Sequence, residues 1–131
     1  MSMDKQMRIL VVDDSSAIRR VIVSALHDLG LRNTIEAADG KHALEVLDKD
    51  QIDLILSDSA MPNMSGLELL EQVRSSKQLR SKPFIMLTGQ KEKEYMIEAV
   101  RKGANSYLVK PFKPQALGEK ISKVVRKPLS V

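Results

Sequence analysis

Leu54-Ile55-Leu56-Ser57-Asp58 is a short apolar run that ends in a carboxylate, and Ser59-Ala60-Met61-Pro62-Asn63-Met64-Ser65-Gly66 follows it directly. The apolar run predicts a strand buried on both faces, and the Pro, Asn, Ser and Gly after it predict a loop. Asp58 is therefore expected at the carboxyl end of a strand. In open α/β sheets that end faces the ligand crevice. From this stretch alone, a carboxylate that only caps the next turn is an equally good interpretation.

The composition is typical of one soluble globular domain. The chain has 131 residues, of which 43% are hydrophobic and 29% charged, which excludes disordered and collagen-like classes. It has no cysteine, which excludes a disulfide framework, thiol catalysis and Cys-based zinc sites and favours the reducing cytoplasm. No signal peptide and no apolar run of bilayer length is present, so neither secretion nor membrane insertion is expected.

The net charge of +4 is unevenly distributed along the chain. From Lys91 onward there are ten Lys and Arg against four Asp and Glu, whereas residues 1–90 carry eleven against thirteen. A basic half of this kind attracts nucleic acid or an acidic protein, or simply forms a solvated face. The chain has only four aromatic residues and no nucleic-acid reading motif, which argues against nucleic acid as a partner.

Short apolar runs alternate five times with segments of helical periodicity. Strands are predicted at 9–12, 33–38, 54–58, 84–87 and 107–109. The helices between them are predicted to turn these residues inward: Ile18, Val21, Ile22, Ala25, Leu26 and Leu29; Ala43, Leu44 and Leu47; Leu67, Leu70 and Val73; Met96, Ile97 and Val100, in a helix over about 91–102; Leu117, Ile121 and Val124. This alternation predicts an α/β fold with a parallel sheet covered by helices on both faces.

Four predicted strands end in residues that could do chemistry: Asp13-Asp14, Asp58, Thr88 and Lys110. In a doubly wound sheet these ends converge on one crevice. Three carboxylates there would repel one another unless a cation neutralised them, and all-oxygen ligands suit Mg²⁺. Together with Lys110 and Thr88 they describe a pocket for a phosphoryl group, in which an attacking carboxylate would form an aspartyl phosphate. The competing interpretation is that Asp13 or Asp14 caps a helix and Lys110 only forms an ion pair.

The two histidines complete the set of candidate ligands. His27 and His42 lie on predicted helices with no partner at metal-binding spacing, so both are predicted to be surface residues.

The motifs together resemble the receiver domain of bacterial two-component response regulators, and among these the stand-alone chemotaxis receivers of the CheY type. The residues that carry the resemblance are Asp13-Asp14, Ser57-Asp58, Met61-Pro62, Gly66-Leu67-Glu68, Thr88-Gly89 and Tyr107-Leu108-Val109-Lys110-Pro111-Phe112. It covers about 8–125 and implies a single receiver domain over 1–131, with no attached output domain. The implied fold is flavodoxin-like, a doubly wound five-stranded parallel sheet of order 2-1-3-4-5 with five helices.

The resemblance also implies a phosphorylation site. Asp58 would be the phosphoacceptor, taking its phosphoryl group from a histidine kinase. Asp14 and Asp58 would bind Mg²⁺ directly, Asp13 would bind it through water, and the backbone carbonyl of Ala60 would complete the protein ligands. The chain would not be an enzyme beyond its own phosphoryl acceptance and autodephosphorylation. An enzyme with an aspartyl intermediate would need a second Asp at position 60 as general acid, and Ala60 occupies that position.

A two-state switch is implied by three further positions. Lys110 would contact the phosphoryl group and precede a cis proline. Thr88 would turn toward the phosphoryl group on activation and let Tyr107 move inward.

Three residues depart from the chemotaxis pattern. Ser59 stands where those regulators carry tryptophan, Ala60 where they carry asparagine, and Gln90 where they carry glutamate. Because positions 60 and 90 flank the path of the hydrolytic water, the departures concern the lifetime of the phosphoryl group.

The implied output face is formed by the fourth helix, the fifth strand and the fifth helix. Its matching residues are Lys93, Met96, Tyr107, Phe112 and Lys120. This mixed apolar and basic surface suits an acidic amphipathic segment. The leading candidate target is a flagellar motor switch protein, while another kinase, a phosphotransfer protein or an anti-sigma-type regulator would use the same face. An adaptor or phosphate shuttle in another phosphorelay is the alternative function.

Overall fold

A computed structural model describes residues 5–89 and 93–125, which form five strands and five helices in strict alternation. The strands are β1 (Ile9–Val12), β2 (Thr34–Ala37), β3 (Leu54–Asp58), β4 (Phe84–Thr88) and β5 (Ser106–Val109). The helices are α1 (Ser16–Asp28), α2 (Gly40–Lys49), α3 (Gly66–Ser75), α4 (Lys93–Arg101) and α5 (Pro114–Val125). No helix of the described part is long and apolar enough to cross a bilayer.

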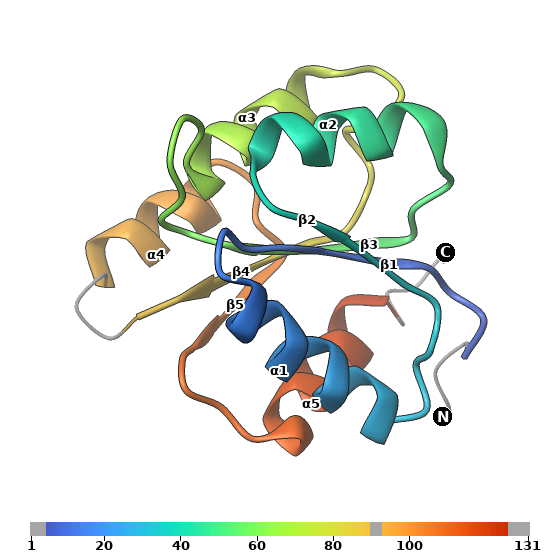
Figure 1. Cartoon of the computed structure of the whole chain (residues 1–131). Helices are drawn as coiled ribbons and strands as arrows, with labels where there is room; N and C mark the ends of the chain where they lie inside the picture. Colours follow the sequence, from blue (N-terminus) through green and yellow to red (C-terminus); the bar gives the residue numbers. More distant parts are fainter. Residues whose placement is uncertain (1–4, 90–92, 126–131) are drawn as a thin grey trace.

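All five strands pair in parallel in the order β2-β1-β3-β4-β5, which confirms the predicted flavodoxin-like topology. Helices α1 and α5 cover one face of the sheet, and α2, α3 and α4 cover the other (Figure 1). Every residue of β1, β3 and β4 is buried, whereas the edge strands β2 and β5 are partly exposed. The continuous apolar runs of the sequence are therefore the central strands, which need apolar side chains on both faces.

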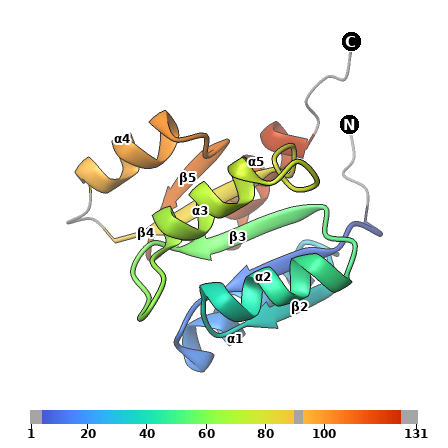
Figure 2. The same cartoon turned by 90° about the horizontal axis from the view of Figure 1, so that it is seen from above.

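The first three helices have N-terminal caps that the local sequence encodes. The side chains of Ser15, Asp39 and Ser65 accept hydrogen bonds from amides in the first turns of α1, α2 and α3. At α3 the arrangement is a full capping box, since the Glu68 side chain also accepts from the Ser65 amide. Seen from above, the helices run alongside the strands, so the loops after the strands gather at one end of the sheet (Figure 2).

Two predicted inward faces are wrong in part. Of the residues predicted to face inward in α1, Ile22, Ala25 and Leu26 are buried, whereas Ile18 and Val21 are 38% and 62% exposed. A helix on a sheet needs only a narrow apolar stripe, and the spacing of apolar residues does not show which of them touch the sheet.

The same correction applies to α4. Ile97 and Val100 are 59% and 49% exposed, Met96 is half-buried, and Ala99 is the residue that α4 buries. α4 begins at Lys93 and ends at Arg101, and the predicted start at Lys91 lies outside the described residues. The prediction for His27 also needs correction, because this residue is half-buried and its Nε2 has no hydrogen-bond partner among the described residues.

Candidate functional site

Three carboxylates meet at the carboxyl end of the sheet. Asp13 follows β1 and Asp58 ends β3, and both are buried, whereas Asp14 is exposed. One carboxylate oxygen from each of the three lies within 4.8 Å of the others. β1 and β3 pair with Val12 opposite Ser57, so the residues that follow this pair, Asp13 and Asp58, are brought close together. The structure thus brings together the three acidic residues that the sequence placed at one crevice.

The Asp13 carboxylate is electrostatically strained in this arrangement. Its Oδ1 accepts a hydrogen bond from the Ser15 amide at 2.9 Å, but its buried Oδ2 has no hydrogen-bond partner in the described part of the chain. Burial raises the pKa of Asp13, and repulsion from Asp58 and Asp14 adds to that effect, while the Ser15 amide and Lys110 oppose it. A buried carboxylate oxygen that accepts no hydrogen bond from the described residues, beside two further carboxylates, fits a hard divalent cation. Asp13, Asp14 and Asp58 would hold Mg²⁺ here.

Lys110 brings a positive charge into the same cluster. Its Nζ lies 2.5 Å from Asp58 Oδ1 and 3.8 Å from Asp13 Oδ2. The Lys110 amide donates to the Thr88 carbonyl at 2.8 Å, which fixes the residue after β5 to the end of β4. The peptide between Lys110 and Pro111 is cis, as the resemblance implied.

Gly66 lets the loop after Asp58 close tightly over the strand end. Its amide donates to the Ser59 carbonyl at 3.0 Å. A Cβ at this position would lie 2.2 Å from the carbonyl oxygen of Asp58, far inside any real contact. Glycine is therefore required because the backbone of α3 approaches the backbone of β3, a requirement that the sequence pattern did not reveal.

Of the predicted switch residues, the Thr88 side chain is buried and the Tyr107 side chain is exposed at the surface. Thr88 is fully buried at the end of β4, and its Oγ1 accepts a hydrogen bond from Ser59 Oγ at 3.2 Å. Tyr107 on β5 is 36% exposed, and the Lys120 ammonium lies 5.2 Å from the centre of its ring. An inward movement of Tyr107 would have to begin from this exposed position.

The two predicted hydrolysis-tuning positions differ in what can be described. Ala60 is exposed in the loop directly after β3, next to the acidic cluster in sequence. Gln90 lies outside the described residues.

The predicted partner face is only partly contiguous. Met96 and Tyr107 line a shallow cavity of about 230 Å³ together with Ile97 and Val100. Lys120 lies over the Tyr107 ring, and Lys93 is exposed at the start of α4.

Phe112 is set apart from this surface. It is half-buried against the core on the α1 side and lines another cavity, of about 550 Å³, with Ala17, Val21 and Pro114.

Ile97 and Val100 are surface residues that the sequence analysis assigned to the core. The signal that could have placed them outside is the excess of apolar residues in α4. Five of its nine residues, namely Tyr95, Met96, Ile97, Ala99 and Val100, are apolar or aromatic, which is too many for one narrow stripe.

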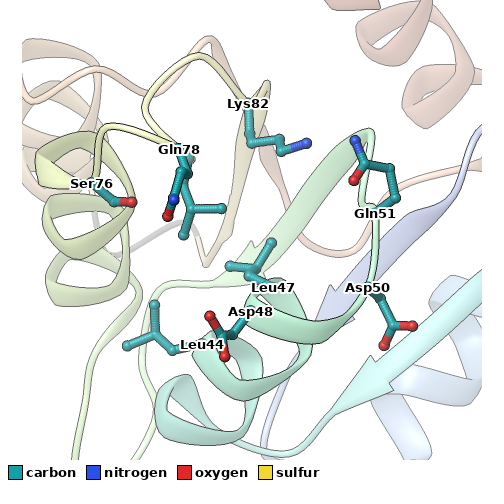
Figure 3. Close-up of a pocket in the computed structure, with 9 residues that line it drawn as sticks. Leu44, Leu47, Asp48, Asp50, Gln51, Ser76, Gln78 and Lys82 are labelled. Atoms are coloured by element: carbon teal, nitrogen blue, oxygen red, sulfur yellow. The ribbon is translucent and has the colours of Figure 1, made fainter.

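A third cavity, of about 350 Å³, lies at the opposite end of the sheet. It is formed by the C-terminal part of α2, the residues before β3 and the segment that leads from α3 to β4 (Figure 3). Leu44, Leu47 and Leu79 give it an apolar part, and polar side chains including Asp48, Gln78 and Lys82 line the rest. None of the predicted site residues lines it.

Comparison with known proteins gives one family. The model of the response regulator receiver domain matches residues 9–122. The chain is 43% identical over 122 residues to chemotaxis protein CheY-3 of Vibrio cholerae, covering 93% of this chain and 94% of that protein. It is 45% identical over 118 residues to chemotaxis protein CheY of Pseudomonas aeruginosa, covering 90% and 95%.

Solved structures agree with these relatives. Chemotaxis protein CheY4 of Vibrio cholerae superimposes with a TM-score of 0.83 at 38% identity, covering 91% of this chain and 98% of that chain. A putative response regulator from Chloroflexus aurantiacus gives a TM-score of 0.88 at 30% identity, covering 93% and 99%.

Replacing Asp13 by asparagine tests the electrostatic cost of the cluster. Because the pKa of Asp13 is raised in the folded state, ionised Asp13 destabilises the metal-free protein at neutral pH. This cost falls as the pH drops through the raised pKa and is gone below the unfolded value. We therefore expect Asp13→Asn to raise the Tm without metal at pH 7 and to lose the stabilisation that Mg²⁺ gives the wild type.

Thermal unfolding at several pH values, with and without Mg²⁺, measures both effects. The exposed Asp48 on α2 provides the control, since Asp48→Asn should leave the Mg²⁺ effect unchanged. A Tm gain for Asp13→Asn that persists at pH values where Asp13 is protonated in both states would contradict the electrostatic explanation.

Gly66→Ala tests the tight closure of the loop over Asp58. The added methyl group has to displace the backbone of β3 or α3, so we expect a loss of about 1–3 kcal/mol in the free energy of unfolding and weaker Mg²⁺ binding. Urea unfolding and titration calorimetry measure the two effects. Gly89→Ala is the matched control, because a Cβ there has no described atom within 4 Å. Equal stability of both variants would show that the loop accommodates the methyl group.

Proposed function

Because this chain belongs to the response regulator receiver domain family, we propose that it is a signalling receiver that accepts a phosphoryl group on Asp58 from a histidine kinase. The observation that carries the proposal is the meeting of Asp13, Asp14 and Asp58 with the ammonium of Lys110 at one strand end. These groups supply a nucleophile, ligands for a cation and a donor to phosphoryl oxygens.

In the proposed reaction, a carboxylate oxygen of Asp58 attacks the phosphorus of the phosphohistidine. A P–O bond forms, the P–N bond breaks, and the imidazole leaves with the bonding electron pair. Bound Mg²⁺ would supply positive charge that offsets the carboxylates and the phosphoryl oxygens. Attack by water on the same phosphorus later releases phosphate and restores the carboxylate. The chain would catalyse no reaction other than its own phosphorylation and dephosphorylation.

Lys110 has a role at both stages of this cycle. Before phosphorylation its Nζ lies against Asp58 Oδ1, where it holds that oxygen and offsets its charge. After phosphorylation the same ammonium is within reach of a phosphoryl oxygen, because the transferred group sits on the Asp58 carboxylate. Lysine suits this task since its ammonium is a compact charge on a flexible stem.

The lifetime of the phosphoryl group would be set by the neighbourhood of the attacking water. Ala60 leaves the position after Ser59 with a methyl group, which neither orients water nor donates a hydrogen bond. Gln90 has no carboxylate at the other predicted position. We therefore propose that the intrinsic hydrolysis rate of this chain differs from that of chemotaxis receivers that carry asparagine and glutamate there.

We further propose that the output is protein binding at the surface of α4, β5 and α5. The cavity lined by Met96, Ile97, Val100 and Tyr107 is apolar, and Lys120 and Lys93 add positive charge around it. Such a surface suits an acidic amphipathic segment. The relatives are named as chemotaxis proteins, which supports a flagellar motor switch protein as the target. Phosphorylation by a kinase that uses ATP would take place in the cytoplasm.

Asp58→Ala tests the phosphoacceptor. We expect the wild type to gain one phosphoryl group from acetyl phosphate only when Mg²⁺ is present, and the variant to gain none while it keeps the fold. Intact-protein mass spectrometry measures the gain, and circular dichroism checks the fold. The control is Asp48→Ala, an exposed carboxylate on α2 that should leave labelling at the wild-type level. Labelling retained in Asp58→Ala would assign the reaction to another residue.

Ile97→Glu tests the output surface. A carboxylate in the middle of the apolar cavity should repel an acidic segment, so we expect the phosphorylated variant to bind purified flagellar motor switch protein about tenfold more weakly or worse. Labelling by acetyl phosphate should be unchanged. Val21→Glu, at an exposed apolar position on α1, is the matched control for binding. If Val21→Glu weakened binding and Ile97→Glu did not, the target would use α1 instead.

A further inference from the structure

Ser59, which directly follows Asp58 at the end of β3, is hydrogen-bonded to both β4 and α3. It is buried, and its amide donates to the Leu87 carbonyl on β4 at 3.0 Å. Its Oγ donates to Thr88 Oγ1 at 3.2 Å. Its carbonyl accepts from the Gly66 amide, at the start of α3, at 3.0 Å. Any movement of the peptide after Asp58 therefore changes hydrogen bonds to β4 and α3.

Tyr95 adds α4 to this set of contacts. Its hydroxyl donates to the Ser59 carbonyl at 3.0 Å and accepts from the Leu67 amide at 2.7 Å. The first amides of a helix have no acceptor within that helix, and Leu67 lies in the first turn of α3. A tyrosine of α4 thus satisfies an amide of α3 and at the same time binds the peptide that follows Asp58.

The contact between Ser59 and Thr88 keeps the Thr88 hydroxyl on one side of the sheet. Side chains alternate along β4, so that Phe84 and Met86 pack with the α2–α4 layer while Ile85 and Leu87 pack with the α1–α5 layer. Thr88 has the parity of Phe84 and Met86, and the Ser59 hydroxyl binds it in that orientation. Thr88 is the acceptor in this hydrogen bond, and a Thr88 side chain that turns to donate to a phosphoryl group on Asp58 moves its hydroxyl away from Ser59.

We propose that Ser59 and Tyr95 are positioning residues that hold Thr88 and α4 in the unphosphorylated arrangement, a pair of contacts that we call the Ser59–Tyr95 latch. The proposal rests on phosphorylation of Asp58. Phosphoryl oxygens are ionised acceptors, and a hydrogen bond to an ionised acceptor is stronger than one between two neutral hydroxyl groups. Thr88 therefore leaves the Ser59 hydroxyl, from which it accepts, and donates to a phosphoryl oxygen instead. The Ser59 peptide then moves, and the Tyr95 hydroxyl loses its contacts with Ser59 and Leu67.

The Leu67 amide reports directly on the latch. In the unphosphorylated wild type we expect slow hydrogen exchange at this amide, since the Tyr95 hydroxyl is its acceptor. After incubation with acetyl phosphate and Mg²⁺ we expect exchange to accelerate by about tenfold or more, the loss of protection that follows when such a bond opens. Tyr95→Phe should exchange fast without phosphorylation, whereas Tyr107→Phe, which removes the other described tyrosine hydroxyl, should not.

NMR hydrogen exchange and mass spectrometry on the same samples distinguish failure of the latch from failure of the proposed phosphorylation. A phosphoryl group gained without any change at Leu67 would overturn the latch and leave the proposed function intact. No phosphoryl gain in the wild type would overturn the proposed function and the latch with it.

Ser59→Ala tests the other contact of the latch. Without the Ser59 hydroxyl, Thr88 turns toward the phosphoryl group at lower cost, so labelling of Asp58 by acetyl phosphate should be roughly 2- to 10-fold faster, the range expected for one neutral hydrogen bond. Ser57→Ala is the matched control, because it removes an equally buried hydroxyl of β3 that donates to the Asp58 carbonyl instead. Equal rates in wild type and Ser59→Ala, or the same increase in Ser57→Ala, would refute the assignment.

Discussion

Repulsion between carboxylates at the end of β1 and β3 is the constraint on which the rest of the structure depends. The two strands are hydrogen-bonded neighbours, and Asp13 and Asp58 directly follow the paired residues Val12 and Ser57. The two carboxylates therefore cannot separate unless the strand pairing is broken. Lys110 offsets part of this charge, yet the pKa of Asp13 is still raised and its Oδ2 has no hydrogen-bond partner within the described residues. Without a metal ion, the site therefore retains unfavourable repulsion between carboxylates, which a bound divalent cation would reduce. The proposed phosphorylation of Asp58 would use such a site, because a bound cation would offset the charge of the incoming phosphoryl group.

The surroundings of Asp58 divide into two sides with different tasks. One side holds the charged groups, namely the three carboxylates and Lys110. Toward α3 and α4 lie neutral contacts, in which Ser59 binds Thr88 and Tyr95 and in which Gly66 allows α3 to approach β3. Phosphorylation of Asp58 would alter the balance between these sides, because Thr88, which accepts from the Ser59 hydroxyl, could instead donate a stronger hydrogen bond to an ionised phosphoryl oxygen. α4 carries both Tyr95, on the inner side of this boundary, and the exposed Ile97 on its outer surface. One short helix thus connects the phosphorylation site to the surface proposed for partners.

Much of the fold and of the acidic site could be predicted from the sequence, because both depend on short-range patterns. The runs that end at Val12 and Asp58 are continuous and apolar, and only central strands of a parallel sheet need such runs. Because the carboxyl ends of parallel strands lie at the same edge of the sheet, the sequence pattern alone is enough to predict that the residues ending these strands lie close together. Ile97 and Val21 were misplaced for a physical reason: helical spacing fixes which residues share a face, but the docking of the helix on the sheet decides how much of that face is covered.

By itself, then, the sequence determined the alternation of strands and helices, their parallel order through the family resemblance, and the arrival of Asp13, Asp14, Asp58, Thr88 and Lys110 at one edge. The alternation and the meeting of these residues follow from the period of the apolar pattern, whereas the strand order was implied by the resemblance alone. Only the tertiary structure decided that Ser59 binds Thr88, that Tyr95 binds Ser59 and Leu67, and that Gly66 touches the Asp58 carbonyl. These contacts join residues of different strands and helices, and their existence depends on distances of a few tenths of an ångström that no sequence pattern encodes. The chemical groups of the site could thus be identified from the sequence, whereas their connection to α4 through Tyr95 is seen only in the tertiary structure.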